Sequence, residues 1–478
     1  MDVETNSSKL GDKCPKHGSD ESSSECAFCV AAGGGSTTQD AVFGEITEGG
    51  PNYRDVGFLG TVALMMKTQV GLGVLSIPSV FDTLGMIPGI ICLIVIATIN
   101  TWSCYSIGAF KLKHPEVYDI SDVGLKLFGP IGRECFAAAF ILLMVFCSAS
   151  GMLSIAISLN AISTHAVCTA VFVAVGWVIA FGCGSIQTLS RVSALAWVGL
   201  VSIIVAIFTV TIAVGVQERP YAAPREGVWT SDYKLFASPD FASASAALSS
   251  LVFAYGATPA FFSIVSEMRE PRHYTRALIV SQISMTTIYI VIGIVVYYFC
   301  GSYVASPALG SAGPAVKKAS YAVALPGLMA STMLLTHYPS KYIFVRALRN
   351  TRHLAANTKI HWATWLGCTF GVSIIGYIIA SAIPVFGGLI SLIGALFATF
   401  TSFQPMGCMW LYDNWKKGTV RGSRTKWLLM VCWAVFVIVI GTFLMVAGTY
   451  GSIVGIMDSY KASGGSAAWS CADNSNSV

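Results

Sequence analysis

The sequence contains little charge. Asp, Glu, Lys and Arg make up 11% of its 478 residues, whereas hydrophobic residues make up 54%. About a quarter of the residues of a soluble domain are charged. The composition therefore excludes an ordinary water-soluble domain and favours a protein that has the lipid bilayer as its solvent. Nothing in it indicates a nucleic-acid partner.

Several motifs are also missing. The first fifty residues contain no apolar core segment, so no secretory signal peptide is expected and the first membrane helix should direct insertion. Paired carboxylates, H-E-x-x-H and a nucleophile elbow are absent, so an enzyme is not predicted. A recognisable selectivity-filter motif is absent too, which disfavours a channel.

Residues 1–52 are rich in Ser, Gly, Asp and Glu, a composition typical of a disordered tail. Within this tail Cys14, His17, Cys26 and Cys29 follow the pattern C-x2-H-x8-C-x2-C, which could close a tetrahedral zinc site. The favoured interpretation, however, is unpaired thiols in a flexible cytosolic segment without a metal.

Eleven stretches are apolar and long enough to span a bilayer, which takes about 20 helical residues. Their expected limits are 56–82, 84–110, 134–160, 167–186, 192–216, 241–267, 277–300, 321–345, 362–383, 385–411 and 427–457. The predicted fold class is an all-α integral membrane protein whose transmembrane domain covers residues 53–457.

Lysine and arginine are concentrated in alternate connections between these stretches. If the amino terminus is cytosolic, the inner connections carry 18 of these residues and the outer connections carry five. Cytosolic loops of membrane proteins are enriched in positive residues, so this orientation is predicted. Eleven spans then place residues 458–478 in a short extracytosolic tail. The outer loops contain one cysteine, Cys168, so no disulfide is expected between them.

The first apolar stretch is interrupted by Gly71, Gly73 and Pro78. Such residues weaken a helix where no water can satisfy the freed N–H and C=O groups. The break should therefore face protein, a cavity or a ligand, although a simple kink or a close-packing face is the alternative. A second interruption, at Phe253 to Pro259, lies in the sixth stretch.

The two interrupted stretches occupy matching places, first and sixth, in two five-helix halves of opposite orientation. Paired breaks in inverted halves are typical of secondary transporters with a binding site near the middle of the membrane. The eleventh stretch lies outside this repeat.

Three motifs resemble the amino acid/auxin permease family. They are GLGVLSIP at 71–78, FAYGATP at 253–259 followed by IVSEMREP at 264–271, and YPSK at 338–341. The likeness covers residues 53–457 and is greatest to the fungal neutral and aromatic amino acid permeases. At residues 256–258 the sequence departs from the more polar residues of many relatives, so their side-chain selectivity is not carried over.

The resemblance implies a LeuT-like 5+5 inverted repeat with one extra helix, and uptake of amino acids driven by protons or sodium, without a cofactor. We expect a plasma-membrane proton symporter that moves neutral, including aromatic, amino acids by alternating access. A vacuolar exporter or exchanger, and an amino-acid sensor with the same fold, are the alternatives. The expected partners are the amino acid and the lipid bilayer, and no oligomeric state is predicted.

The backbone of the two breaks is expected to hold the charged groups of the substrate. A half-helix that begins at Gly71 to Val74 would direct free N–H groups at a carboxylate. The open carbonyl groups around Thr68, Gln69, Phe253 and Tyr255 would accept from the ammonium group. The predicted substrate-binding residues are Thr68, Gln69, Gly71, Leu72, Gly73, Val74, Phe253, Tyr255, Gly256, Cys147 (or its neighbour Ser148) and Thr332. For the side chains among them, the alternative is that they face lipid or the core.

Lys67 is the most informative charge, because a buried ammonium group usually has a partner or a function. In sodium-coupled relatives the equivalent stretch and a hydroxyl of the eighth helix bind sodium. The resemblance therefore implies that Lys67, near Thr332, takes the position of the cation and couples transport to protons. Snorkelling of Lys67 to the inner surface and coupling to sodium are the alternatives. Glu267 is a further coupling candidate, or else a gate or structural ion pair.

Overall fold

The computed structural model describes residues 38–40, 44–46, 56–186, 189–220, 222–224, 226–227, 229–348, 351, 353, 358–416, 424–462, 469 and 471–475. The four predicted zinc ligands lie outside these residues. The chain divides into two units, residues 1–52 and 53–478. In the first unit, strands β1 (Thr38–Asp40) and β2 (Gly44–Ile46) form a short antiparallel pair.

The described part of the second unit is helical. Its α-helices are α1 (Phe58–Gln69), α2 (Ile77–Leu84), α3 (Met86–Lys113), α4 (Ile120–Ser163), α5 (Thr169–Gly184), α6 (Leu189–Val216), α7 (Phe241–Tyr255), α8 (Phe261–Glu267), α9 (Tyr274–Cys300), α10 (Pro314–Leu348), α11 (Lys359–Ala382), α12 (Phe386–Ile393), α13 (Thr399–Ser402), α14 (Gln404–Asn414) and α15 (Arg424–Ala462). The shorter 3-10 and π elements are η2 (Gly73–Ser76), η3 (Thr258–Ala260), η4 (Pro271–His273), η5 (Gly301–Tyr303), η6 (Ala308–Ser311) and η7 (Gly394–Ala398).

The helices have the length and apolarity of membrane spans. Among the described residues, nine helical segments can cross a membrane, and the bent pair formed by α1 with η2 and α2 would be a tenth. Helix α5 is apolar but has only 16 residues, and it occupies the place of the fourth predicted span. The all-α membrane class is confirmed, whereas the count of eleven spans and the LeuT-like repeat stay predictions.

The first break lies where the glycines predict it. Helix α1 ends at Gln69, Val70 is extended, and the chain resumes as η2 at Gly73. Pro78 occupies the first turn of α2, where its missing N–H costs no helical hydrogen bond. The two halves of this segment are bent by 43°.

The second break has a similar construction. Asp240 caps α7, accepting from the main-chain N–H groups of Ala242 and Ser243. The helix ends at Tyr255, and η3, which contains Pro259, leads into α8. A Cβ atom on Gly73 would lie 2.5 Å from Cα of Ala254, so this glycine allows the two breaks to touch.

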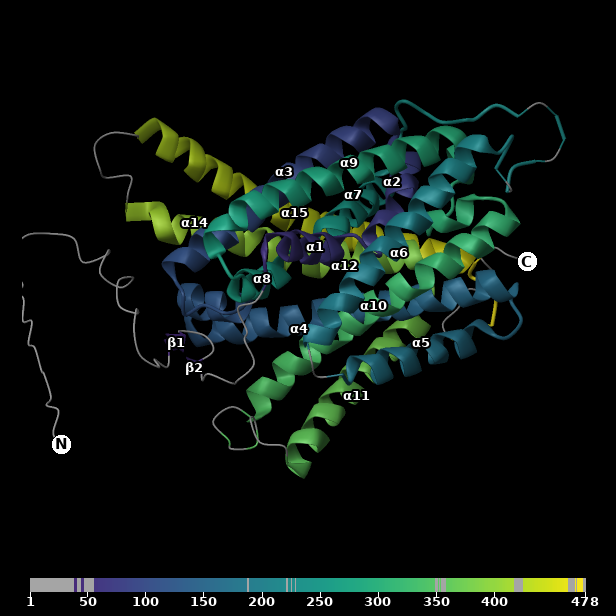
Figure 1. The fold of residues 1–478 in the computed structure, drawn as a ribbon. Helices are drawn as coiled ribbons and strands as arrows, with labels where there is room; N and C mark the ends of the chain where they lie inside the picture. Colours follow the sequence, from purple (N-terminus) through teal and green to yellow (C-terminus); the bar gives the residue numbers. More distant parts are fainter. Residues whose placement is uncertain are drawn as a thin grey trace, which may run out of the picture. The chain divides into compact units, whose positions relative to one another are not determined.

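Helices from both halves of the chain surround the breaks. Figure 1 shows α3 and α9 side by side on one side of α1, and α4 with α10 on the other. Helix α4 begins well before the predicted limit of 134, because Asp119 caps it and the chain bends at Gly129 (φ 73°), just before Pro130, without leaving the helical segment. Helix α15 packs against α7, α12 and α14.

The structure contains a disulfide that the prediction about pairs of outer loops did not consider. Cys168, at the start of α5, is bonded to Cys471 in the carboxyl-terminal tail. The prediction considered loop cysteines only and left out the tail, which returns to the ends of the helices. There Thr169 donates to the carbonyl of Ala472, and Asn160 donates to Asn474.

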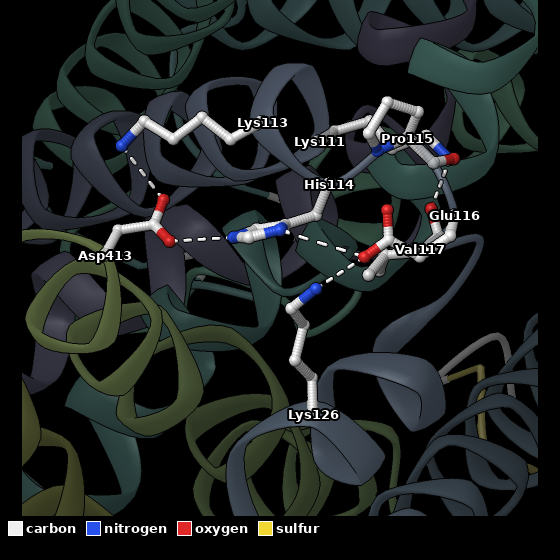
Figure 2. Close-up of polar contacts among 8 residues, drawn as sticks. All are labelled: Lys111, Lys113, His114, Pro115, Glu116, Val117, Lys126 and Asp413. Atoms are coloured by element: carbon white, nitrogen blue, oxygen red, sulfur yellow. Dashed lines mark hydrogen bonds and ion pairs between the residues drawn. The ribbon is translucent and has the colours of Figure 1, made fainter. Parts of the chain in front are cut away.

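A charged cluster lies at the opposite end of the helices, where α3, the connection to α4 and α14 meet. Figure 2 shows Asp413 of α14 accepting from Lys113 Nζ at 2.9 Å and lying 2.8 Å from His114 Nε2. The other ring nitrogen of His114 lies 3.8 Å from Glu116, which also accepts from Lys126. The cluster joins the end of α3 to α14.

Candidate functional site

A cavity of about 70 Å³ opens between the two breaks. It is lined by Lys67, Thr68, Gln69, Gly71, Leu72, Gly73, Leu143, Met144, Cys147, Phe253, Gly256, Ala257, Ala260, Ser331, Leu334, Leu335, Tyr338 and Ala398. These residues come from α1 and η2, from α7 and η3, and from α4, α10 and η7. The wall is mostly apolar, and the polar groups are concentrated at the breaks.

The first break supplies free hydrogen-bond donors to this cavity. Val70 N–H bonds back to Met66, but the main-chain N–H groups of Gly71 and Leu72 have no acceptor among the described residues. Both residues line the cavity. Unpaired N–H groups at the end of a half-helix favour a bound anion such as a carboxylate.

Lys67 borders the same cavity and is only 4% exposed. Its Nζ donates to Ser331 Oγ at 2.6 Å and to the carbonyl of Gly327 at 3.3 Å, both in α10. In the described part of the chain no carboxylate lies within ion-pairing distance of this ammonium group. The side chain therefore points across to α10 and does not reach for the membrane surface, with neutral oxygens as its acceptors.

The carbonyl groups at the breaks are partly occupied. Tyr289 of α9 donates to the carbonyls of Gln69 and Ala254, and Gln69 Nε2 donates to the carbonyl of Tyr255. The carbonyls of Gln69 and Tyr255, which we expected to receive a substrate ammonium group, thus already accept from the protein.

The cavity contains most of the predicted substrate-binding residues. Thr68, Gln69, Gly71, Leu72, Gly73, Phe253, Gly256 and Cys147 line it. Three predicted residues do not. Val74 lines a separate, smaller apolar pocket, Tyr255 donates to or accepts from Thr286 of α9, and Thr332 donates to the carbonyl of Leu328 in its own helix.

Two further candidates lie away from the cavity. Ser148, the alternative to Cys147, is hydrogen-bonded to Thr336 of α10 at 2.6 Å. Glu267 ends α8, does not line the cavity, and interacts electrostatically with Lys341 of α10. This position fits the alternative of a structural ion pair or gate.

Sequence reasoning missed residues of α4 and α10 that face the cavity. The most important is Ser331, since it binds Lys67, whereas the sequence analysis selected its neighbour Thr332. Leu143, Leu334 and Tyr338 were also missed. A signal was present in α10, since Thr332, Thr336 and Ser340 recur every four residues on one buried face, and that spacing indicates the inward side of the helix next to Ser331.

Comparisons with known proteins find similar sequences over most of the chain. The sequence model of the family described as "Transmembrane amino acid transporter protein" matches residues 54–454. A "Transmembrane transporter" of Gibberella moniliformis is 32% identical over 432 residues, 90% of each chain. A "Transmembrane transporter" of Fusarium pseudograminearum is 30% identical over 452 residues, 94% of this chain and 93% of the relative. The "N amino acid transport system protein" of Neurospora crassa is 33% identical over 438 residues, 90% of this chain and 91% of the relative.

Proposed function

The chain belongs to the family of transmembrane amino acid transporter proteins, and from that membership we propose that it is a secondary active transporter of neutral amino acids, including aromatic ones, that works by alternating access. A proton is its coupling ion. The name of the Neurospora relative, "N amino acid transport system protein", supports amino acids as the substrates.

The observation that carries the proposal is the cavity between the two breaks. The free N–H groups of Gly71 and Leu72 suit a carboxylate, and the walls formed by Leu143, Leu334 and Phe253 suit an uncharged side chain. A cationic side chain would lose its water in this cavity without gaining a partner of opposite sign, and an acidic one would meet only Lys67, whose ammonium group already donates to Ser331 and to the carbonyl of Gly327. Neutral amino acids are therefore the substrates that this site favours.

Lys67 is the proposed proton carrier. Its ammonium group links α1 to α10 through Ser331 and the carbonyl of Gly327. Loss of the proton removes both the charge and one donor, which weakens this link and lets the two helices separate. Sodium would have to bind beside an ammonium group that already uses these oxygens, so proton coupling is favoured over sodium coupling.

The proposed orientation, with a cytosolic amino terminus, is supported by charge and disulfide chemistry. The connections rich in Lys and Arg lie on one side, and the bonded pair of Cys168 and Cys471 belongs to the other. Disulfides persist outside the cytosol, so the second side is the outer side of the proposed topology. We propose the plasma membrane as the location, with the vacuolar membrane as the alternative.

Uptake into proteoliposomes tests the proposal. Labelled phenylalanine and other neutral amino acids are offered with an inward pH gradient, with and without sodium, to the native chain, to Lys67→Met and to a control, Lys461→Met. Lys461 is an exposed residue at the end of α15. The native chain and Lys461→Met should accumulate substrate without sodium, because the proton gradient drives them.

Lys67→Met should lose accumulation but keep exchange of labelled for unlabelled substrate, since exchange needs the binding site and not the proton. Native uptake that requires sodium contradicts the proton assignment. If a folded native protein moves no amino acid, the transport proposal itself fails and the sensor alternative replaces it.

A further inference from the structure

Breaks in membrane helices leave main-chain groups that something must satisfy, because lipid cannot. Here one helix, α9, donates hydrogen bonds to main-chain carbonyl groups at both breaks, although it belongs to neither broken segment. Its side chains reach the first break at Gln69 and the second at Ala254 and Tyr255.

The central contact is the hydroxyl of Tyr289, which is fully buried. Its oxygen lies 3.2 Å from the carbonyl oxygen of Gln69 and 3.1 Å from that of Ala254. A phenol has one proton, so a single donor is shared almost equally between the two breaks. Each break therefore depends on the position of the other.

A second connection passes through the side chain of Gln69. Gln282 Nε2 donates to Gln69 Oε1 at 2.8 Å, and Gln69 Nε2 donates to the carbonyl of Tyr255 at 3.1 Å. Tyr255 is in turn bonded to Thr286 at 2.9 Å, and its ring meets the ring of Tyr289 edge-on at 5.3 Å. The links run from α9 to both breaks and from break to break.

The spacing of these residues explains why one helix can do this. Gln282, Thr286, Tyr289 and Gly293 follow at intervals of four, three and four, which places them on one face of α9. At Gly293 the helix approaches α2 so closely that a Cβ atom would lie 2.8 Å from the ring of Phe81. The same face thus holds α2, just beyond the first break.

We propose that Tyr289, supported by Gln282, is a positioning residue that makes the two breaks move as one unit. The functional consequence of this inference rests on the proposed transport activity. While substrate is bound, the N–H groups at the first break and the cavity walls at the second break keep the same position relative to each other. Tyr289 does not line the cavity, so it acts through the backbone that it holds.

Hydrogen–deuterium exchange on the purified full chain tests this without any substrate. The test variant is Tyr289→Phe, which keeps the ring and removes the hydroxyl. The control is Tyr297→Phe on the same helix. The hydroxyl of Tyr297 accepts from the main-chain N–H of Lys234, in the connection between α6 and α7. Loss of one hydrogen bond should speed amide exchange about threefold to tenfold in peptides covering residues 66–76 and 250–260 together. Tyr297→Phe should leave both peptides unchanged. Loosening of one break alone, or the same loosening in the control, overturns the inference.

Uptake kinetics supply the second readout. Tyr289→Phe should raise KM for a neutral amino acid about threefold to tenfold and change the maximal rate less, since binding needs the breaks aligned. A variant with loosened breaks but native KM would show a purely structural role and overturn the positioning role. A native chain without any uptake would refute the proposed function, whereas the exchange result would still decide whether the breaks are linked.

Discussion

The environment of Lys67 depends on which residues of α10 face its ammonium group. A buried ammonium group is costly in a membrane unless oxygens surround it. The ammonium group of Lys67 donates hydrogen bonds to two neutral oxygens of α10, and the closer one belongs to Ser331. Ser331 and Thr332 both donate to carbonyls of α10, those of Gly327 and Leu328, but the hydroxyl of Thr332 packs against Gly151 of α4 and not against Lys67. One step along a helix turns a side chain by about 100°, so adjacent hydroxyls have different surroundings.

The pair Ser331→Ala and Thr332→Ala tests this difference. Ser331→Ala removes an acceptor from a charged donor, and we expect proton-driven uptake to fall about tenfold or more. Thr332→Ala removes a bond internal to α10, and we expect a loss of less than about threefold. Initial uptake rates at equal protein content measure both. A larger loss in Thr332→Ala would instead favour the residue selected from the sequence.

At the scale of elements, the molecule depends on contacts that only small residues allow. Gly73 lets η2 touch α7, and Gly293 lets α9 approach α2. In membranes such close approach is a main source of helix association, since there is little hydrophobic driving force between helices. The breaks are therefore packing sites as well as places where the backbone is exposed to the cavity.

Gly73→Ala should separate the two breaks. Its Cβ would lie 2.5 Å from backbone Cα of Ala254, which cannot move like a flexible side chain. We expect uptake to be abolished and the melting temperature to fall, as overpacking costs about 1–3 kcal/mol or more. Gly182→Ala in α5 is the matched control, because nothing lies within 4 Å of its added Cβ, and it should behave as native. Normal uptake by Gly73→Ala would refute this packing role.

The cluster in Figure 2 contains two carboxylates that differ in burial. The side chain of Asp413 is 7% exposed and pairs with Lys113 and His114, whereas the side chain of Glu116 is 57% exposed. We expect Asp413→Asn to destabilise the joint between α3 and α14 by about 1–3 kcal/mol. Glu116→Gln should cost at most about 1 kcal/mol, as surface ion pairs do. Thermal unfolding of both variants checks that the loss of stability is larger for Asp413→Asn than for Glu116→Gln, and equal losses of stability would contradict this prediction.

The pH dependence of the Glu116 contact follows from the same geometry. The hydrogen bond from Lys126 holds the pKa of this carboxyl below its usual range. Its small contribution to stability is therefore fully present above the unfolded pKa of about 4.3 and is lost as the pH falls through the lower folded value. The difference between native and Glu116→Gln stability should stay constant between neutral and mildly acidic pH.

At the scale of the whole molecule, the carboxyl-terminal tail joins parts that are distant in sequence. Helix α15 packs on α7, α12 and α14, while the tail that follows it is bonded to the start of α5. The carbonyl of Ser475 also accepts from Lys317 at the start of α10. The tail thus connects α15 covalently to the start of α5, and it is joined to α4 and α10 by hydrogen bonds.

Removing this connection by Cys471→Ser should lower the melting temperature. The bond spans 303 residues of sequence, and loss of a native disulfide typically costs about 2–5 kcal/mol. Cys432→Ser, which alters an exposed free cysteine of α15, is the control and should melt as native.

The same bond reports orientation. In intact cells a reductant that cannot cross membranes should free Cys471 for labelling if the tail faces outward at the plasma membrane. Labelling that requires permeabilised cells would instead favour the vacuolar location or the opposite topology.

The sequence by itself determined the features that depend on composition and local backbone chemistry. Low charge and long apolar stretches indicate the membrane class, and Gly71, Gly73 and Pro259 indicate where the helices break, because those residues weaken a helix in any surroundings. Lys67 could be selected as well, since a charge within an apolar stretch is conspicuous.

Only the tertiary structure decided which groups meet. The choice of Ser331 over Thr332, the turning of Tyr255 towards α9, the shared hydroxyl of Tyr289 and the pairing of Cys168 with Cys471 all join residues distant in sequence. A period of small polar residues, such as Thr332, Thr336 and Ser340 in α10, can mark the buried face of membrane helices, but it does not say which groups of other helices they meet. Their rotation is set by close packing against neighbours, and that packing exists only once the chain has folded.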